Sequence, residues 1–197
     1  METHLITSEL ISACQRTDQA ACTRLFDLTA SSVYRLSYSL LLNKQDAEDV
    51  VQEVFVYVFR NLHQYDPQRG SFQTWLYTIT VSRSRNARRR KLLPMVDLSH
   101  LLQFGLEPPA PPEESPEMAA LRSDAKRVLA EALATLSPRL HEAVVLRYGQ
   151  QLSYKEMSDI LNCPEKTAES RVRLAHAALR TAMQHKHIAV LEELLPI

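Results

Sequence analysis

Glycine, cysteine and long apolar runs are scarce in this sequence of 197 residues. Only three glycines occur, while Ala, Leu, Glu, Gln and Arg are frequent, a composition that favours helix. No apolar run approaches the length of a membrane span. The first ten residues lack the basic patch and apolar core of a signal peptide. The sequence therefore predicts an all-α cytoplasmic protein that does not insert into a membrane.

The cysteines and histidines do not form a metal-binding pattern. Cys14, Cys22 and Cys163 are odd in number and lack the paired spacing of a zinc site. The seven histidines show neither an HExxH motif nor clustering. We expect buried or inert thiols, as is usual for intracellular cysteines, and neither a metal nor a cofactor.

Charge is arranged in blocks, although 23 basic residues balance 23 acidic ones. An acidic cluster at residues 46–53 is followed by residues 67–96, which contain no Asp or Glu. Residues 92–121 then contain no Lys or Arg and hold six of the ten prolines. Acidic, proline-rich sequence of this kind buries too little apolar surface to order itself and is typical of a linker.

The charge blocks predict a domain organisation. We expect a helical domain over residues 1–93, a flexible linker over 94–118, and a second helical domain over 119–186. Residues 187–197 form an apolar tail that could dock on the second domain or on a partner.

Helical periodicity defines four segments in the first domain. We expect helices over residues 5–17 and 19–42, a third from near Asp46, and a fourth capped by Ser71. Asp46 and Asp49 resemble a capping box. Apolar positions at helical spacing predict the core-facing stripes; they are Leu25, Phe26, Val33, Leu36 and Leu40, then Val50, Val54 and Val58, then Phe72, Trp75, Leu76 and Ile79.

The second domain is punctuated by caps and breakers. Ser137 precedes a proline at a first helical position, and Gly149 ends that helix. Ser153 and Glu156 form a capping box, and the last helix spans about residues 165–184. Two helices joined by a short turn, the second of them basic, are typical of a helix-turn-helix.

The start of the last helix carries side chains that can read base edges in a major groove. These side chains are Lys166, Thr167, Ser170, Arg171 and Arg173. An ordinary helical hairpin with a solvated face is the alternative. A stand-alone helix-turn-helix repressor would use this domain alone.

A cluster of cations ends the fourth helix of the first domain. Six like charges without a nearby acid in the sequence repel one another unless a polyanion is present. Cations beside aromatic rings suit single-stranded nucleic acid, because cations neutralise phosphates and rings stack on bases. For Trp75, a place in the core is an equal alternative. The residues concerned are Trp75, Tyr77, Arg83, Arg85, Arg88, Arg89, Arg90 and Lys91.

The acidic cluster allows two hypotheses. Carboxylates could hold a divalent metal for phosphodiester cleavage, as in a metal-dependent nuclease. However, Glu48 points away from Asp46, Asp49 and Glu53 at helical spacing. A protein-contacting face is favoured, because Asp49, Gln52, Glu53 and Arg60 line up away from the valine stripe.

Two long segments resemble a known family. Residues 46–91, DAEDVVQEVFVYVFRNLHQYDPQRGSFQTWLYTITVSRSRNARRRK, resemble conserved region 2 of bacterial RNA polymerase sigma factors. Residues 137–180, SPRLHEAVVLRYGQQLSYKEMSDILNCPEKTAESRVRLAHAALR, resemble region 4. Two such domains with a short linker are similar to the extracytoplasmic-function (ECF) group, which performs no chemistry itself.

The resemblance implies partners and sites. The helix with Asp46, Asp49, Gln52 and Glu53 would bind the β′ clamp helices of core RNA polymerase, and region 4 the β flap. Residues 75–90 would capture the unpaired −10 element of promoter DNA, and the segment from Lys166 to His176 would read the −35 element. An anti-sigma factor is a further expected partner.

The resemblance is inexact in region 4. Residues 166–171 read KTAESR where the family usually shows GTVKSR, so Glu169 stands where a phosphate-contacting cation is common. Ser158 and Asn162 replace the usual Ala and Gly. Asn162 tolerates the left-handed backbone that the turn requires.

Overall fold

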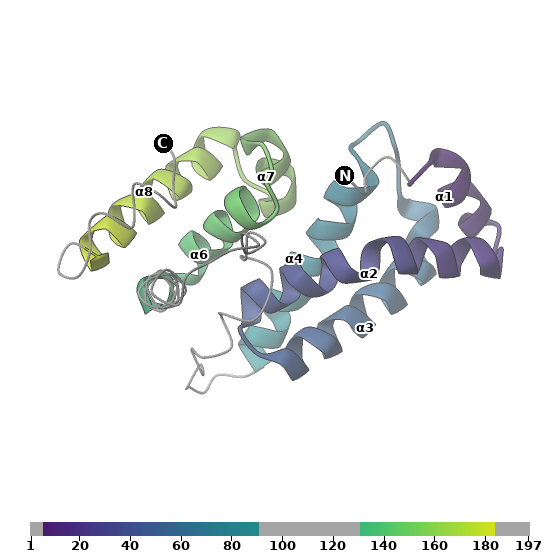
Figure 1. Ribbon diagram of the computed structural model, residues 1–197. Coiled ribbons are helices and arrows are strands. Elements are labelled where there is room, and N and C mark those ends of the chain that lie inside the picture. Colours follow the sequence, from purple (N-terminus) through teal and green to yellow (C-terminus); the bar gives the residue numbers. More distant parts are fainter. Residues whose placement is uncertain (1–5, 91–130, 184–197) are drawn as a thin grey trace, which may run out of the picture. The chain divides into compact units, whose positions relative to one another are not determined.

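The computed structural model describes residues 6–90 and 131–183, and every regular element within these ranges is a helix (Figure 1). The predicted all-α class is confirmed. The chain divides into two compact units, with the main break between Met95 and Val96, and each unit is described by itself. The predicted linker and the apolar tail lie outside the described residues.

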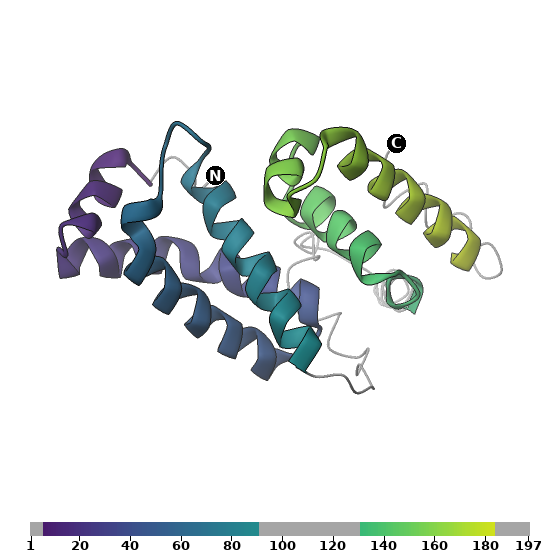
Figure 2. The same cartoon turned by 180° about the vertical axis from the view of Figure 1, so that it is seen from behind.

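The first unit is a helical bundle. Its elements are α1 (Ser8–Gln15), α2 (Gln19–Leu41), α3 (Lys44–Asn61), the short 3₁₀ helix η2 (Leu62–Gln64) and α4 (Phe72–Arg90). The long helices α2, α3 and α4 lie side by side in both views (Figures 1 and 2). The short α1 packs on α2 and η2.

The predicted stripes form the core of this unit. Val50, Val54 and Val58 are fully buried because one side of α3 faces α2 and α4. Each such side chain contributes about 1.5–3 kcal/mol on burial. Phe72, Leu76 and Ile79 of α4 and the α2 side chains Leu25, Val33, Leu36 and Leu40 are also buried. Two predicted positions are not buried, since Trp75 is half-buried and Phe26 is 39% exposed.

The predicted cap is present at α4 but not at α3. Ser71 caps α4 as expected, because its hydroxyl accepts a hydrogen bond from the Thr74 amide at 3.1 Å. Helix α3 begins at Lys44, close to the predicted start near Asp46, but the capping role predicted for Asp46 is wrong. Its cap is Asn43, whose side chain accepts from the Asp46 amide at 3.0 Å.

A disulfide joins α1 to α2. Cys14 and Cys22 are bonded, with Cα atoms 4.9 Å apart, so the prediction of unpaired thiols is wrong for this pair. Cys163 is a free thiol. Closing so short a loop restricts the unfolded chain and contributes about 2–3 kcal/mol to stability. The two cysteines are eight residues apart and lie in adjacent helices, and the turn at residues 16–18 brings them together.

The second unit contains the helix-turn-helix. Residues 131–134 are helical and precede α6 (Pro138–Val144), the π-helical segment η4 (Val145–Gly149), α7 (Tyr154–Leu161) and α8 (Glu165–Met183). Ser137 takes the N-cap position with a proline in the first turn, although its side chain makes no cap hydrogen bond. The buried side chains of the second unit include Leu133, Leu146, Met157, Ile160, Val172 and Leu179.

Local chemistry shapes the turn between α7 and α8. The predicted capping box is present, since the Ser153 amide donates to the Glu156 carboxylate at 2.8 Å and the Glu156 amide donates to the Ser153 hydroxyl at 3.3 Å. Asn162 has a φ of 50°. The expected left-handed backbone at this residue is therefore confirmed, and it turns the chain into α8.

Two buried hydroxyls are unsatisfied in the first unit. Ser37 of α2 and Ser84 of α4 are essentially inaccessible, and neither Oγ has a hydrogen-bond partner within the described ranges. A buried donor without a partner costs about 1–3 kcal/mol.

We predict that Ser84→Ala stabilises the protein. Alanine removes the unpaired hydroxyl and is the better helix former, so the free energy of unfolding rises by about 1 kcal/mol. Urea denaturation followed by circular dichroism measures the change. Ser82→Ala, on the exposed side of the same helix, is the matched control and changes stability less. Destabilisation by Ser84→Ala would contradict the assignment of an unsatisfied hydroxyl.

Candidate nucleic-acid interface

The arginines at the end of α4 are held by neighbouring helices. Arg88 donates from Nη2 to the carbonyl oxygen of Leu40 at 2.6 Å. Arg90 Nη2 lies 2.8 Å from Glu53 Oε1. The interpretation that no acid lies near these cations is therefore wrong in space, because α3 packs beside α4.

The acidic cluster acts on Arg90 electrostatically. The hydrogen bond and the charge of Glu53 raise the pKa of Arg90, and Asp49 and Asp46 add to this effect. Glu53 and Arg90 had been assigned to different partners from the sequence. The structure brings them together, so the acidic and basic surfaces meet at one edge of the first unit.

The other α4 cations differ in exposure. Arg83 stacks over the Tyr57 ring, with Cζ 4.9 Å from the centroid, and Arg85 is half-buried. Arg89 is exposed. A phosphate can therefore reach the exposed Arg89 without displacing the contacts of Arg83, Arg88 or Arg90.

The aromatic candidates on α4 lie in or against the core. Trp75 is half-buried, and its ring centroid is 5.7 Å from those of Tyr65 and Phe72. Tyr77 is 2% exposed, and its hydroxyl accepts a hydrogen bond from Gln73 at 3.1 Å. Trp75 and Tyr65 are thus each partly accessible to solvent near the start of α4.

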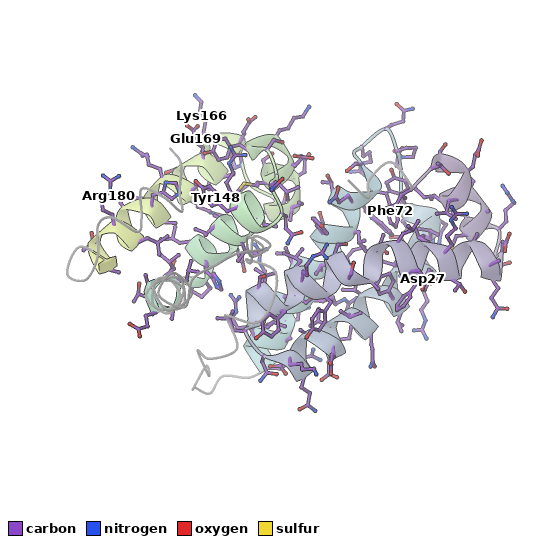
Figure 3. All side chains as sticks on the ribbon, viewed as in Figure 1. Asp27, Phe72, Tyr148, Lys166, Glu169 and Arg180 are labelled. Atoms are coloured by element: carbon purple, nitrogen blue, oxygen red, sulfur yellow. A yellow bond between two sulfur atoms is a disulfide. The ribbon has the colours of Figure 1, made fainter. Side chains whose placement is uncertain are left out.

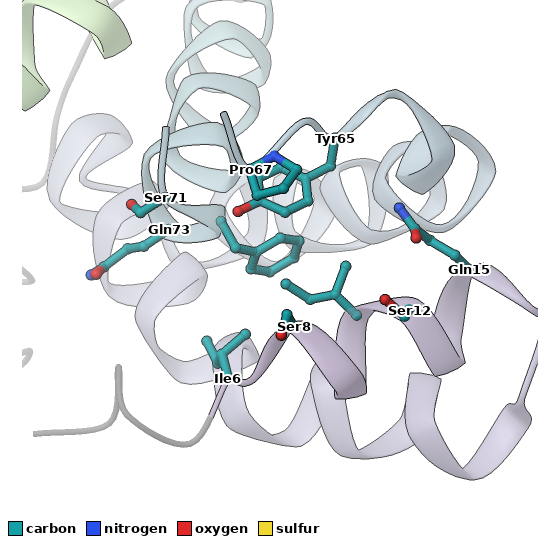
Figure 4. A pocket seen from close by; sticks show the side chains of 10 residues that line it. Ile6, Ser8, Ser12, Gln15, Tyr65, Pro67, Ser71 and Gln73 are labelled. Atoms are coloured by element: carbon teal, nitrogen blue, oxygen red, sulfur yellow. The ribbon is translucent and has the colours of Figure 1, made fainter. Parts of the chain in front are cut away.

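A cavity of about 360 Å³ lies beside these rings. Ser8 and Ser12 of α1 line it on one side, and Tyr65 and Pro67 line it on the other (Figure 4). The Tyr65 hydroxyl donates to the Gly70 carbonyl at 3.2 Å and so holds the loop before α4. Sequence reasoning missed this cavity, because α1 and the loop are about 50 residues apart in the chain.

The outward side of α3 combines acidic and apolar side chains. Asp49 and Gln52 are exposed, as predicted for a protein-contacting face, while Asp46 and Glu53 are half-buried. Val56 and Phe59 continue this side at 52% and 39% exposed. Phe26 of α2 lies beside them, since its ring packs edge-on against Phe55 at 4.6 Å.

We call Phe26, Val56 and Phe59 the α2–α3 apolar patch. Sequence reasoning missed it by placing Phe26 in the core. The signal was present, because Val56 and Phe59 follow Gln52 at helical spacing on its own side of α3.

The start of α8 projects most of the predicted base-reading side chains. Lys166 and Arg173 are exposed, and Thr167, Ser170 and Arg171 are half-buried. Glu169 is exposed on the same helix, and it projects with Lys166 and Arg180 (Figure 3). This surface combines donors and acceptors suited to base edges with the carboxylates of Glu165 and Glu169, which repel phosphate.

His176 lies against the interior of the second unit. Its Nε2 is 2.7 Å from the Tyr148 hydroxyl, and the two rings stack with centroids 5.4 Å apart. Burial, with a smaller contribution from the charge of Arg180, lowers the pKa of His176. A neutral imidazole bonded to η4 holds α8 in place rather than presenting a cation to a ligand.

Arg147 orders the loop before α7. Its Nη1 donates to the Leu152 carbonyl at 2.8 Å, and its guanidinium stacks over the Tyr154 ring at 4.9 Å. These contacts hold the start of α7, the first helix of the helix-turn-helix. The sequence pattern did not indicate this role for Arg147.

The described part of the chain contains neither a metal-binding group nor a membrane-spanning helix. Within residues 6–90 and 131–183, no three His, Cys, Asp or Glu side chains are grouped so as to hold a metal ion. In the same ranges, no helix has the length and apolar character needed to span a membrane.

Comparison with known proteins matches both units. Residues 25–92 match the family model of Sigma-70 region 2, and residues 126–179 match that of Sigma-70 region 4. The ECF RNA polymerase sigma factor SigW of Bacillus subtilis is 27% identical, over 91% of this chain and 98% of its own. SigE, an ECF RNA polymerase sigma factor of Mycolicibacterium smegmatis, is 35% identical over 83% of this chain and 63% of its own.

Solved structures share the fold. CnrH, in complex with the cytosolic domain of CnrY, is similar with a TM-score of 0.64 and 23% identity, over 90% of this chain and 97% of CnrH. The sigma factor RpoE of Bartonella quintana, in complex with the anti-sigma factor NepR, gives a TM-score of 0.60 and 19% identity, over 84% and 98% of the two chains.

We predict that His176 titrates below its ordinary pKa of 6.5. The folded protein then binds fewer protons than the unfolded chain, so stability is complete above that value and falls as the pH drops below it. NMR titration of the His176 ring, assigned by its loss in His176→Gln, measures the pKa. Arg180→Gln moves it toward 6.5 by removing the repelling charge. A pKa at or above 6.5 in the unchanged protein would contradict the burial.

Proposed function

The chain belongs to the ECF group of bacterial RNA polymerase sigma factors, and from this premise we propose how its surfaces divide the work of transcription initiation. The protein binds core RNA polymerase, recognises the −35 and −10 promoter elements and promotes DNA melting. The observation that carries this proposal is the ordered pair of Sigma-70 regions 2 and 4. Residues 25–92 lie within the first unit, and most of residues 126–179 lie within the second.

The outward side of α3 is proposed to bind the β′ clamp helices. Asp49 and Gln52 supply exposed polar groups there, and Asp46 and Glu53 flank them. The α2–α3 apolar patch lies next to these groups and adds apolar surface that a partner can bury. Apolar anchors surrounded by polar groups are the arrangement that gives protein interfaces most of their affinity.

The end of α4 is proposed to hold the melted −10 strand. Arg89 contacts phosphate directly, with Arg83 and Arg85 on the same helix. Arg88 and Arg90 position the helix end through Leu40 and Glu53. Trp75 offers a ring edge to a flipped base, which offsets the cost of unstacking. Tyr77 is left out, since it is buried.

The start of α8 is proposed to read the −35 element. Lys166, Thr167, Ser170, Arg171 and Arg173 provide the contacts, and His176 acts by positioning α8 through Tyr148. Glu169 disfavours a phosphate at its position, so the phosphate contacts that set the register of α8 on the duplex must come from other side chains. Region 4 is also proposed to contact the β flap.

The protein is proposed to perform no chemistry of its own, because nucleotide addition belongs to the core enzyme. It is also proposed to act in the cytoplasm. The domain limits 1–93 and 119–186, with a linker between them, are part of the proposal. An anti-sigma factor is a proposed partner. Support comes from the sigma factor RpoE, a protein of this fold whose solved structure is a complex with the anti-sigma factor NepR.

Reconstitution with core RNA polymerase tests the proposal. We expect the chain plus core enzyme to initiate on genomic DNA of the source organism at sites that share upstream motifs, as shown by sequencing transcript 5′ ends. Asp49→Lys should raise the concentration for half-maximal transcription roughly tenfold or more, because it reverses a charge on the proposed interface.

The matched control is Glu9→Lys, the same charge change on an exposed residue of α1. It should shift this concentration little. Tight duplex binding without core enzyme would instead indicate a repressor, and magnesium-dependent cleavage a nuclease. Either result, without core-dependent initiation, would overturn the proposal.

We predict that Arg89→Ala weakens binding to single-stranded DNA more than Arg90→Ala. Arg89 is free to meet phosphate, whereas Arg90 must first leave Glu53. Losing one phosphate contact lowers the slope of log affinity against log salt by about 0.7. Fluorescence anisotropy with a random-sequence oligonucleotide measures both variants. Glu53→Gln should strengthen binding by releasing Arg90, and equal slopes for the two arginine variants would contradict the assignment.

A further inference from the structure

Cys14 and Cys22 form a pair in which one sulfur is accessible and the other is not. Cys14 on α1 is 5% exposed, whereas Cys22 on α2 is half-buried. Their Cα separation of 4.9 Å lies within the range that a disulfide spans without backbone movement. We propose that this pair is a site of reversible oxidation by low-molecular-weight disulfides, and that its oxidation state controls how firmly α1 is held on the first unit.

The reduced form has an acceptor for the Cys22 thiol close by. Two thiols cannot keep the short bonding distance of a disulfide, so the two sulfurs move apart on reduction. Cys22 Sγ lies 3.6 Å from the Cys14 carbonyl oxygen in the oxidised protein. After a small side-chain movement, a reduced Cys22 thiol can therefore donate a weak hydrogen bond to this oxygen.

The exposure difference sets the order of steps. The Cys22 thiolate attacks one sulfur of oxidised glutathione, forms a mixed disulfide and releases one glutathione thiolate. The Cys14 thiolate then attacks the Cys22 sulfur and releases the second glutathione thiolate. The two cysteines lose two protons and two electrons, and the oxidant gains both as two glutathione thiols.

The element that this bond holds is marginal without it. Helix α1 has eight residues, too few for independent stability. Its other attachments include the buried Ile11, the partly buried Leu10 and Ala13, and the hydrogen bond from Gln15 Nε2 to the Leu62 carbonyl at 3.0 Å. The turn between α1 and α2 is strained, because Thr17 is a β-branched residue with a φ of 64°. This strain opposes the approach of α1 to α2 that the disulfide requires.

Holding α1 also holds one wall of the cavity beside Tyr65. Ser8, Ser12 and Gln15 line that wall. Oxidation thus stabilises the cavity, and reduction lets α1 detach more often. That this regulates a cytoplasmic protein rests on the proposed function, because disulfides there are usually transient and redox-sensing.

Hydrogen exchange on the full-length chain tests the proposal. The reduced protein is treated with oxidised glutathione, and mass spectrometry of peptides locates the bond. We expect an intramolecular Cys14–Cys22 disulfide that dithiothreitol reverses. Amide exchange across α1 should slow roughly tenfold or more on oxidation, while α3 changes little.

Two variants separate the pair from other thiol effects. Cys163→Ser keeps both responses, and the double variant Cys14→Ser with Cys22→Ser loses both while retaining helical circular dichroism. Persistent glutathione adducts, disulfides through Cys163 alone, or equal α1 exchange in the two states would each overturn the proposal. Both readouts use the isolated chain, so failure of core-dependent transcription would overturn the proposed function and leave this inference standing.

Discussion

The burial of the α3 valine stripe between α2 and α4 is the constraint on which the first unit depends. Once Val50, Val54 and Val58 face inward, helical geometry turns Asp49, Gln52, Val56 and Phe59 outward together. The same packing sets α4 alongside α3, and its cations therefore end near the acids of the preceding helix. One apolar contact determines both surfaces.

The contact between Glu53 and Arg90 changes how the charge blocks are understood. A neutral chain with separated acidic and basic segments suggests two independent surfaces for two partners. In the folded unit the surfaces share an edge, and a group on one neutralises a group on the other. Exposed ion pairs of this kind are weak and exchange partners readily. In the proposed function, polymerase and DNA would therefore compete with an internal contact at this edge rather than meet preformed, isolated charges.

Sequence reasoning performed well where a local rule decided the outcome. The valine stripe, the Ser153–Glu156 box, the Ser71 cap and the left-handed Asn162 depend on spacing or on one residue's chemistry. It failed where long-range contacts decided. Phe26 fitted the stripe but faces outward, Tyr77 lies in the core, and the partners of Cys14 and Arg90 depend on how separate helices pack. The role of His176 was missed because Tyr148 lies 28 residues away in the chain.

The bond from Arg88 to the carbonyl of Leu40 has a consequence for how the chain matures. Leu40 sits in the last turn of α2, where carbonyl groups lack partners within the helix. The group that satisfies it lies 48 residues further along. During synthesis, the Leu40 carbonyl therefore lacks this partner until nearly the whole first unit has left the ribosome, although the Leu42 amide can already bond to the Tyr38 carbonyl. Completion of this bundle is tied to the arrival of its most basic segment.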